Sequence, residues 1–224
     1  MTDYQGVDHY FIDQLVNEDR ALKDLLDTNQ KEGLPPHDVS PSQGKFLAML
    51  TKITKADRVL EIGTLGGYST LWFASALPAH GRIVTLEYSS HHARVARANF
   101  ENSHFAHKID LIEGAAAKSL QHLIDQQEKP FDLIFIDADK ENNALYLELS
   151  LQLSNVGTII IGDNVVRNGE VLNKDSTDSR VQGVRRFVEA LSASPYLDST
   201  AIETIGVKGY DGFTISLVNA TPPH

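Results

Sequence analysis

The chain has 224 residues, of which 42% are hydrophobic and 22% charged, as expected for one soluble globular domain with a full core. Its formal net charge of -10 argues against a broad polyanion-binding surface, because neutralising phosphates needs clustered Lys and Arg. The sequence contains no cysteine, which excludes disulfides, a thiol nucleophile and thiolate metal ligands. No apolar run approaches the roughly 20 residues of a membrane span, and the start lacks the apolar core of a signal peptide. We therefore expect a cytoplasmic protein with small-molecule partners and no membrane partner.

Helical spacing of apolar residues marks the first part of the chain. Leucines and phenylalanine recur on one face from Tyr10 to Asn29, which predicts a single amphipathic helix there. A second helix is predicted to begin at Ser40-Pro41, since the serine can cap the first turn and proline suits the first helical position. Both helices precede the first expected strand.

Short apolar segments then alternate with segments of helical spacing. The expected strands are Arg58–Ile62, Arg82–Glu87, Ile109–Ile112, Leu133–Asp137 and Thr158–Gly162, and the expected helices are Tyr68–Leu77, Ser90–Phe100, Ala116–Ile124 and Asn142–Leu153. This alternation predicts an α/β fold with a doubly wound, mostly parallel sheet. We expect one domain over residues 1–224, with an N-terminal helical segment over 1–55 and a Rossmann-like core over 56–220.

The last part of the chain departs from the alternation. An irregular polar stretch over 167–179 is followed by a helix near Val181–Ala193. Two further strands are expected around Thr200–Ile205 and Phe213–Val218, joined by a glycine-rich segment. Two strands joined in this way predict a terminal hairpin.

A glycine-rich turn, Gly63-Thr64-Leu65-Gly66-Gly67, follows the first expected strand, and its glycines allow a sharp turn and a close approach to a ligand. Leu65 stands where the dinucleotide fingerprint requires glycine, so a nicotinamide cofactor fits poorly. Glu61 suits an amine-bearing ligand, and Glu87, which closes the second strand, can accept hydrogen bonds from ribose hydroxyls. These features predict a nucleotide-like cofactor; the alternative is a plain strand-to-helix turn.

Acidic residues close two consecutive apolar strands. Asp137 and Asp139 end FDLIFIDAD, and Asp163 and Asn164 end VGTIIIGDN. Because the carboxyl ends of parallel strands meet in the ligand crevice, these oxygen donors are expected to cradle a divalent metal beside the cofactor. The alternative is that the acids only end strands or cap the segments that follow.

Six motifs occur in a fixed order: VLEIGTLGGYST, VTLEYS, IDLIEGAA, FDLIFIDADK, GDNVVRNGEV and GVRRF. With this set, roughly residues 38 to 218 resemble the cation-dependent S-adenosylmethionine O-methyltransferases of the catechol and caffeoyl-CoA type. The resemblance implies a class I methyltransferase fold, in which a seven-stranded, mostly parallel sheet carries an antiparallel C-terminal hairpin strand. It also implies a homodimer, with the N-terminal helices and the hairpin as candidate contacts.

The same resemblance implies a catalytic apparatus. Asp137, Asp163 and Asn164 would hold a divalent cation, Mg²⁺ in the first place and Ca²⁺ or Mn²⁺ as alternatives. The cation would orient a vicinal dihydroxy aromatic acceptor and lower the pKa of its hydroxyl. Lys140 would assist removal of the proton, and Asp137 would serve both the metal and the cofactor. The hydroxyl would then displace the methyl group of S-adenosyl-L-methionine in line.

The cofactor contacts implied by the resemblance surround the glycine-rich turn and the end of the third strand. They are Val39, Glu61, Gly63, Tyr68, Ser69, Glu87, Gly114, Ala115 and Asp137. Val39 matches a family position that covers the cofactor, although a helix staple explains it equally well. Trp72 is expected in the core, and His91-His92 is expected to open a solvated helix.

Three other functions stay open from the sequence. A relative that methylates a hydroxyuridine in transfer RNA is disfavoured by the acidic balance, although a dimer could build a basic groove. A nicotinamide oxidoreductase is opposed by Leu65. A non-catalytic cofactor sensor is opposed by the presence together of Asp137, Lys140, Asp163 and Asn164.

Overall fold

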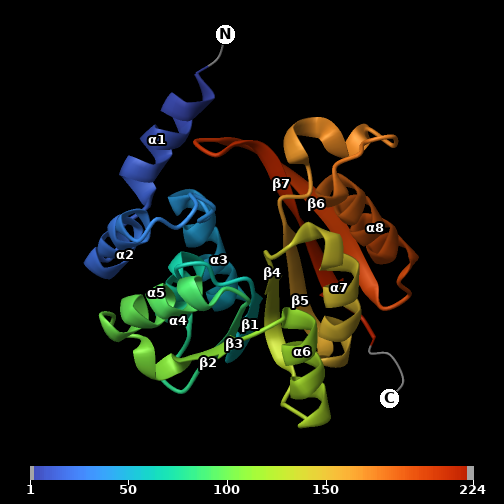
Figure 1. Cartoon of the computed structure of the whole chain (residues 1–224), viewed down its shortest axis with the longest axis horizontal. Helices are drawn as coiled ribbons and strands as arrows, with labels where there is room; N and C mark the ends of the chain where they lie inside the picture. The colour runs from blue at the N-terminus through green and yellow to red at the C-terminus, as the bar shows by residue number, and fades with distance from the viewer. Residues whose placement is uncertain (1–2, 221–224) are drawn as a thin grey trace.

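The computed structural model describes residues 3–220, so the ends of the predicted domain, residues 1–2 and 221–224, lie outside the described residues. Its centre is a seven-stranded sheet in the order β3-β2-β1-β4-β5-β7-β6 (Figure 1). The strands are β1 (Arg58–Ile62), β2 (Arg82–Glu87), β3 (Ile109–Glu113), β4 (Phe131–Ile136), β5 (Ser154–Asp163), β6 (Leu197–Gly206) and β7 (Gly209–Val218). Strand β7 runs antiparallel to both β5 and β6, and the other pairs are parallel. The predicted fold class is confirmed.

Helices cover both faces of this sheet (Figure 1). They are α1 (Tyr4–Leu15), α2 (Arg20–Lys31), α3 (Pro41–Ile53), α4 (Tyr68–Ala76), α5 (Ser90–Glu101), α6 (Ala116–Asp125), α7 (Asn143–Gln152) and α8 (Ser179–Ala193), with short 3₁₀ helices η1 (Ala106–Lys108), η2 (Lys140–Asn142) and η3 (Arg167–Leu172). Alternate residues of a strand point to opposite faces, so Val59 joins the apolar cluster under α2, α3 and α4, whereas Leu60 joins the cluster under α6, α7 and α8. Burial on both faces explains why the central strands are rich in apolar residues.

The predicted single helix over Tyr10–Asn29 is wrong, because two helices, α1 and α2, occupy this region. The chain is extended at Val16, and the side chain of Asp19 accepts a hydrogen bond from the backbone N–H of Ala21 as α2 begins. A side chain that caps a first turn in this way marks the start of a new helix. The prediction missed this break because the helical spacing of apolar residues continues from α1 into α2. Helix α2 buries leucines, whereas α1 has no buried residue.

Other elements differ from the predictions mainly in their ends. The hydroxyl of Ser40 caps α3 by accepting from the N–H of Gln43 at 3.2 Å, as predicted. Strand β5 begins at Ser154 rather than Thr158, and the hairpin strands are longer than predicted, leaving only Val207 and Lys208 between them. Within residues 3–220, no helix has the length and apolar character needed to cross a membrane.

Candidate functional site

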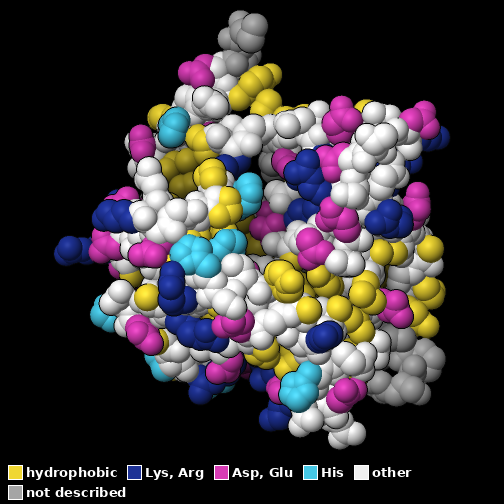
Figure 2. Space-filling model, in the orientation of Figure 1, with side chains coloured by type: hydrophobic (Ala, Val, Ile, Leu, Met, Phe, Trp, Pro, Cys, Tyr) yellow, Lys and Arg dark blue, Asp and Glu magenta, His cyan; other side chains and the backbone are white. Residues whose placement is uncertain are grey.

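A cleft of about 1590 Å³ opens at the carboxyl ends of β1, β2, β4 and β5, and Figure 2 shows a hollow near the middle of this face with acidic and basic side chains around it. The loop before α3 and the β6–β7 hairpin complete its walls. The cleft brings together most of the predicted site residues: Val39, Gly63, Ser69, Glu87, Ala115, Asp137, Lys140, Asp163 and Asn164. Three predicted cofactor residues, Glu61, Tyr68 and Gly114, do not line it.

Gly63 joins the turn after β1 to the end of β4. Its φ of +103° is in the region that favours glycine, and a Cβ there would lie 2.1 Å from the carbonyl oxygen of Asp137. The N–H of Asp137 donates to the carbonyl oxygen of Ile62 at 2.8 Å, which holds the two strand ends together. The expected cofactor turn and the first expected metal ligand are therefore in direct contact.

Glu87 is held at the cleft wall by backbone donors. One carboxylate oxygen, Oε2, accepts from the N–H groups of Thr64 at 3.2 Å and Leu65 at 2.8 Å. The other, Oε1, accepts from the N–H of Ser89 at 2.8 Å. A carboxylate can accept about four hydrogen bonds, so acceptor capacity is left over for a ligand. The glycine-rich turn thus fixes the orientation of Glu87.

Glu61 lies behind the cleft wall and is completely buried. It accepts hydrogen bonds from the hydroxyls of Ser69 at 2.6 Å, Thr70 at 2.5 Å and Thr85 at 2.5 Å. Burial raises the pKa of Glu61 to about 7. In this arrangement Glu61 positions Ser69, which does line the cleft.

Tyr68 points away from the cleft. Its hydroxyl donates to Glu18 in the segment between α1 and α2, and its ring packs edge-on against Trp72. Burial raises the pKa of Tyr68 above its ordinary value. Trp72 is 4% exposed and belongs to the core, as predicted. Tyr68 therefore ties the N-terminal segment to α4.

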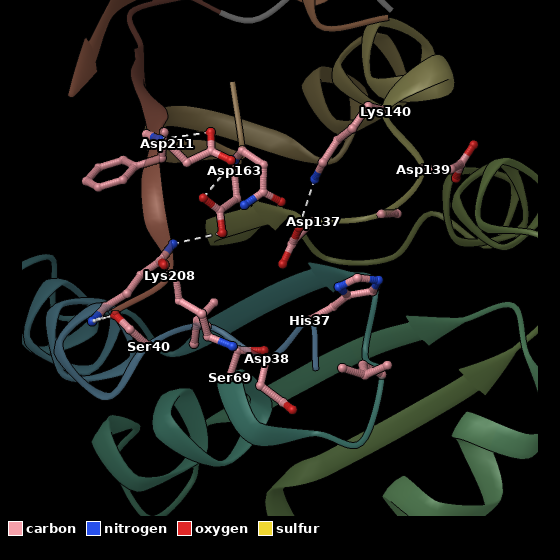
Figure 3. Close-up of a pocket in the computed structure, with 18 of the residues that line it drawn as sticks. His37, Asp38, Ser40, Ser69, Asp137, Asp139, Lys140, Asp163, Lys208 and Asp211 are labelled. Carbon is pink, nitrogen blue, oxygen red and sulfur yellow. Dashed lines mark hydrogen bonds and ion pairs between the residues drawn. The ribbon is translucent and has the colours of Figure 1, made fainter. Parts of the chain in front are cut away.

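Two carboxylates and an amine meet at the ends of β4 and β5 (Figure 3). Lys140 Nζ donates to Asp137 Oδ1 at 2.8 Å. Asp163 Oδ2 accepts from Gln43 Nε2 at 2.8 Å, and its Oδ1 accepts from the N–H of Asn164 at 2.8 Å. Burial raises the pKa of Asp163 to about 7, and the negative charge of Asp137 adds to the rise.

Oxygen donors of the right kind are present for a hard cation. In the part of the chain that the structure describes, no three His, Cys, Asp or Glu side chains form a group that could hold a metal. The predicted ligands Asp137, Asp163 and Asn164 are two carboxylates and one amide, so they form a different kind of set. Two carboxylates that repel each other in a buried cleft, next to an amide oxygen, suit a divalent ion such as Mg²⁺. The residues present fit the predicted cation.

Asp139 does not join this group. Figure 3 shows it turned away from Asp137, and it is exposed. Its carboxylate accepts from the hydroxyl of Tyr146 at 2.6 Å and from the amide of Asn142. Of the two acids that close β4, the first faces the cleft centre and the second stabilises the start of α7.

Several cleft residues had not been predicted. One of them is Gln43, whose side chain orients Asp163. Its place in the sequence, in the first turn of a helix capped by Ser40, was the only hint of a role at the cleft. Asp8 accepts from the Ser42 hydroxyl and from the N–H of Val207, each at 3.0 Å. These contacts join α1, α3 and the hairpin tip across almost the whole sequence, and no local pattern indicates them.

Comparisons with known proteins agree with this geometry. The model of the O-methyltransferase family matches residues 13–217. A catechol O-methyltransferase from Niastella koreensis is 44% identical over 215 residues, which are 96% of this chain and 97% of that protein. A caffeoyl-CoA O-methyltransferase from Zea mays is 33% identical over 92% of this chain and 82% of its own length. The crystal structure of an O-methyltransferase from Bacillus cereus in complex with SAH has 51% sequence identity and a TM-score of 0.94, covering 96% of this chain and 98% of that one. The chain therefore belongs to the O-methyltransferase family, as its motifs predicted.

Proposed function

We propose that this protein transfers the methyl group of S-adenosyl-L-methionine to a hydroxyl of a catechol-like or other vicinal dihydroxy aromatic, with the help of a divalent cation. One observation carries the proposal. The Lys140–Asp137 pair, at 2.8 Å, and the buried Asp163 converge in the same cleft as the Gly63 turn. Such a cleft can hold a cofactor, an oxygen-bound cation and an acceptor side by side.

Five groups would bind the cofactor. They are the backbone at Gly63 together with Ser69, Glu87, Ala115 and Val39, all of which line the cleft. The bound SAH of the Bacillus cereus protein supports this assignment, since S-adenosylhomocysteine is what remains of the methyl donor after transfer. Glu61 and Tyr68 would act indirectly, through Ser69 and through the packing of α4.

Asp137, Asp163 and Asn164 would hold the cation. When bound, a divalent cation at these oxygens would act as a Lewis acid and make the acceptor hydroxyl more acidic. Gln43 and the N–H of Asn164 fix both oxygens of Asp163, and such outer contacts orient the ligands of a metal site.

Lys140 would receive the hydroxyl proton at Nζ. Its side chain is 7% exposed and donates to Asp137, so its position beside the cleft centre is fixed. Asp163 closes β5 and Lys140 lies in η2 just after β4, and both line the cleft. Most of the rate acceleration would come from this fixed geometry rather than from a covalent intermediate.

The test is to incubate the protein with methyl-labelled S-adenosylmethionine, Mg²⁺ and a panel of vicinal dihydroxy aromatics, and to detect product by mass spectrometry. Turnover that a chelator abolishes and added Mg²⁺ restores is expected. Turnover that is unchanged by the chelator would contradict the cation role. A transfer RNA acceptor is not favoured, because the formal net charge is -10 and the cleft centre carries several carboxylates.

We also propose that the protein is a homodimer that buries the outer face of α1. This helix leaves Tyr10 61%, Phe11 50% and Leu15 64% exposed, and exposed apolar side chains gathered on one element are typical of an interface. Light scattering of the wild type and of Phe11→Asp should give a dimer and a monomer, respectively. A wild type that is monomeric at high concentration would contradict the proposal.

A further inference from the structure

Arg167 stands at a strained position beside the proposed metal ligands. It lies four residues after Asp163, the last residue of β5, and three residues after Asn164. Its φ of 57° and that of Asn168, 55°, are both in the left-handed region, which residues with a Cβ rarely adopt. Strained backbone of this kind is often kept where it positions a functional side chain.

The hairpin holds this strained segment in place. Asp211 Oδ1 accepts from the N–H of Val166 at 3.0 Å and from the N–H of Arg167 at 3.2 Å. The N–H of Val165 donates to the carbonyl oxygen of Gly212 at 3.0 Å. The backbone of Arg167 is therefore fixed by β7, and its side chain is left to line the cleft.

The guanidinium of Arg167 carries a charge with no partner among residues 3–220: it makes no hydrogen bond, and no carboxylate lies within ion-pair distance of it. The residue is half-buried. The neighbouring cleft residue Arg180 is already paired, since it donates to both oxygens of Asp178 at 2.9 Å and 2.6 Å. Asp211 accepts from backbone N–H groups through Oδ1 and makes no ion pair with Arg167. Arg167 thus lines the cleft with a guanidinium that makes no hydrogen bond or ion pair of its own within residues 3–220, although Asp178 is close enough to feel its charge.

We propose that Arg167 binds a carboxylate on the methyl acceptor, so that the preferred substrates are acidic dihydroxy aromatics. This inference rests on the proposed function. A guanidinium matches a carboxylate through two parallel hydrogen bonds. Three residues of chain span at most about 10 Å, so a carboxylate on the aromatic ring or on a short side chain reaches Arg167 while the hydroxyls lie near Asn164.

The other charges of the cleft favour one orientation of an acidic acceptor. Glu87 presents negative charge near the cofactor turn and would repel an anion there. An acidic acceptor is therefore admitted with its carboxylate toward Arg167 and its hydroxyls toward Lys140. Arg167 acts as a residue for specificity and orientation, not for proton transfer.

The test compares 3,4-dihydroxybenzoate with its uncharged methyl ester, using kcat/KM for methylation by the wild type, Arg167→Gln and Arg167→Lys. Loss of a charge-assisted pair should lower kcat/KM for the acid by about 10- to 100-fold, mainly through KM, and leave the ester within about twofold. Arg167→Lys should recover part of the lost kcat/KM for the acid, because lysine keeps the positive charge but cannot form the two parallel hydrogen bonds of a guanidinium. Arg20→Gln removes a charge from a side chain that is 91% exposed on α2, and it should change neither substrate.

An equal loss for acid and ester in Arg167→Gln would overturn the inference. Methylation of neither compound by the wild type would instead count against the proposed function. In that event, calorimetric titration of both compounds into the wild type and Arg167→Gln still decides the role of Arg167. Weaker binding of the acid alone supports the carboxylate contact, and unchanged binding of the acid overturns it.

Discussion

Glu61 makes the stability of this protein depend on pH. The side chain is completely buried, and its pKa is raised from 4.5 to about 7 by that burial. A rise of this size corresponds to about 3 kcal/mol between the two protonation states. The folded protein keeps the proton that the unfolded chain loses, so this stabilisation is complete below pH 4.5. It is lost as the pH rises through about 7.

The perturbation is Glu61→Gln, which keeps a similar shape but does not ionise. Glutamine can still accept a hydrogen bond through its oxygen, and the hydroxyls of Ser69 and Thr70 can turn to accept from its amide. Between pH 5 and pH 8, the free energy of unfolding of the variant relative to the wild type should therefore rise by about 2 to 3 kcal/mol.

Urea unfolding at several pH values, followed by far-ultraviolet circular dichroism, measures this difference. Glu189→Gln, which removes an exposed carboxyl from α8, is the control and should parallel the wild type at every pH. If Glu61→Gln also parallels the wild type, the buried carboxyl does not retain its proton near neutral pH and the reasoning is wrong.

Three further predictions concern the cleft. Asp163→Ala should abolish chelator-sensitive turnover while SAH still binds in calorimetry; retention of full activity would exclude Asp163 as a ligand. Glu87→Ala should weaken binding of SAH by about tenfold, because it removes a charged acceptor and frees three backbone N–H groups; unchanged affinity would contradict this role. Gly63→Ala should lower the melting temperature, since its Cβ would lie 2.1 Å from the carbonyl oxygen of Asp137. An unchanged melting temperature would show that the turn can relax.

The fold and much of the cleft could be predicted because the relevant signals are local. Alternating strands and helices determine the doubly wound sheet, and residues that close parallel strands, such as Asp137 and Asp163, must meet at one edge. The break between α1 and α2 also had a local signal, Asp19, but continuous apolar spacing concealed it.

The parts that could not be predicted depend on contacts between distant segments. Asp8 reaches the N–H of Val207 across 199 positions, and Gln43 reaches Asp163 across 120. Neither pairing leaves a pattern within a window of sequence. Glu61 and Asp139 show a related difficulty. The sequence indicates where a residue lies along a strand or turn, but not the direction in which its side chain points. One is directed into the core and the other toward α7.

The position of β7 between β5 and β6 has a consequence for biosynthesis. The strand that is translated last becomes an interior strand, so β5 emerges from the ribosome with an open edge and must wait for its neighbour. Strand β6 has no place in the sheet until β7 has paired with β5. A nascent chain can therefore complete its cofactor turn early, but it gains the Asp211 clamp on Arg167 only after nearly all of the described residues have been made.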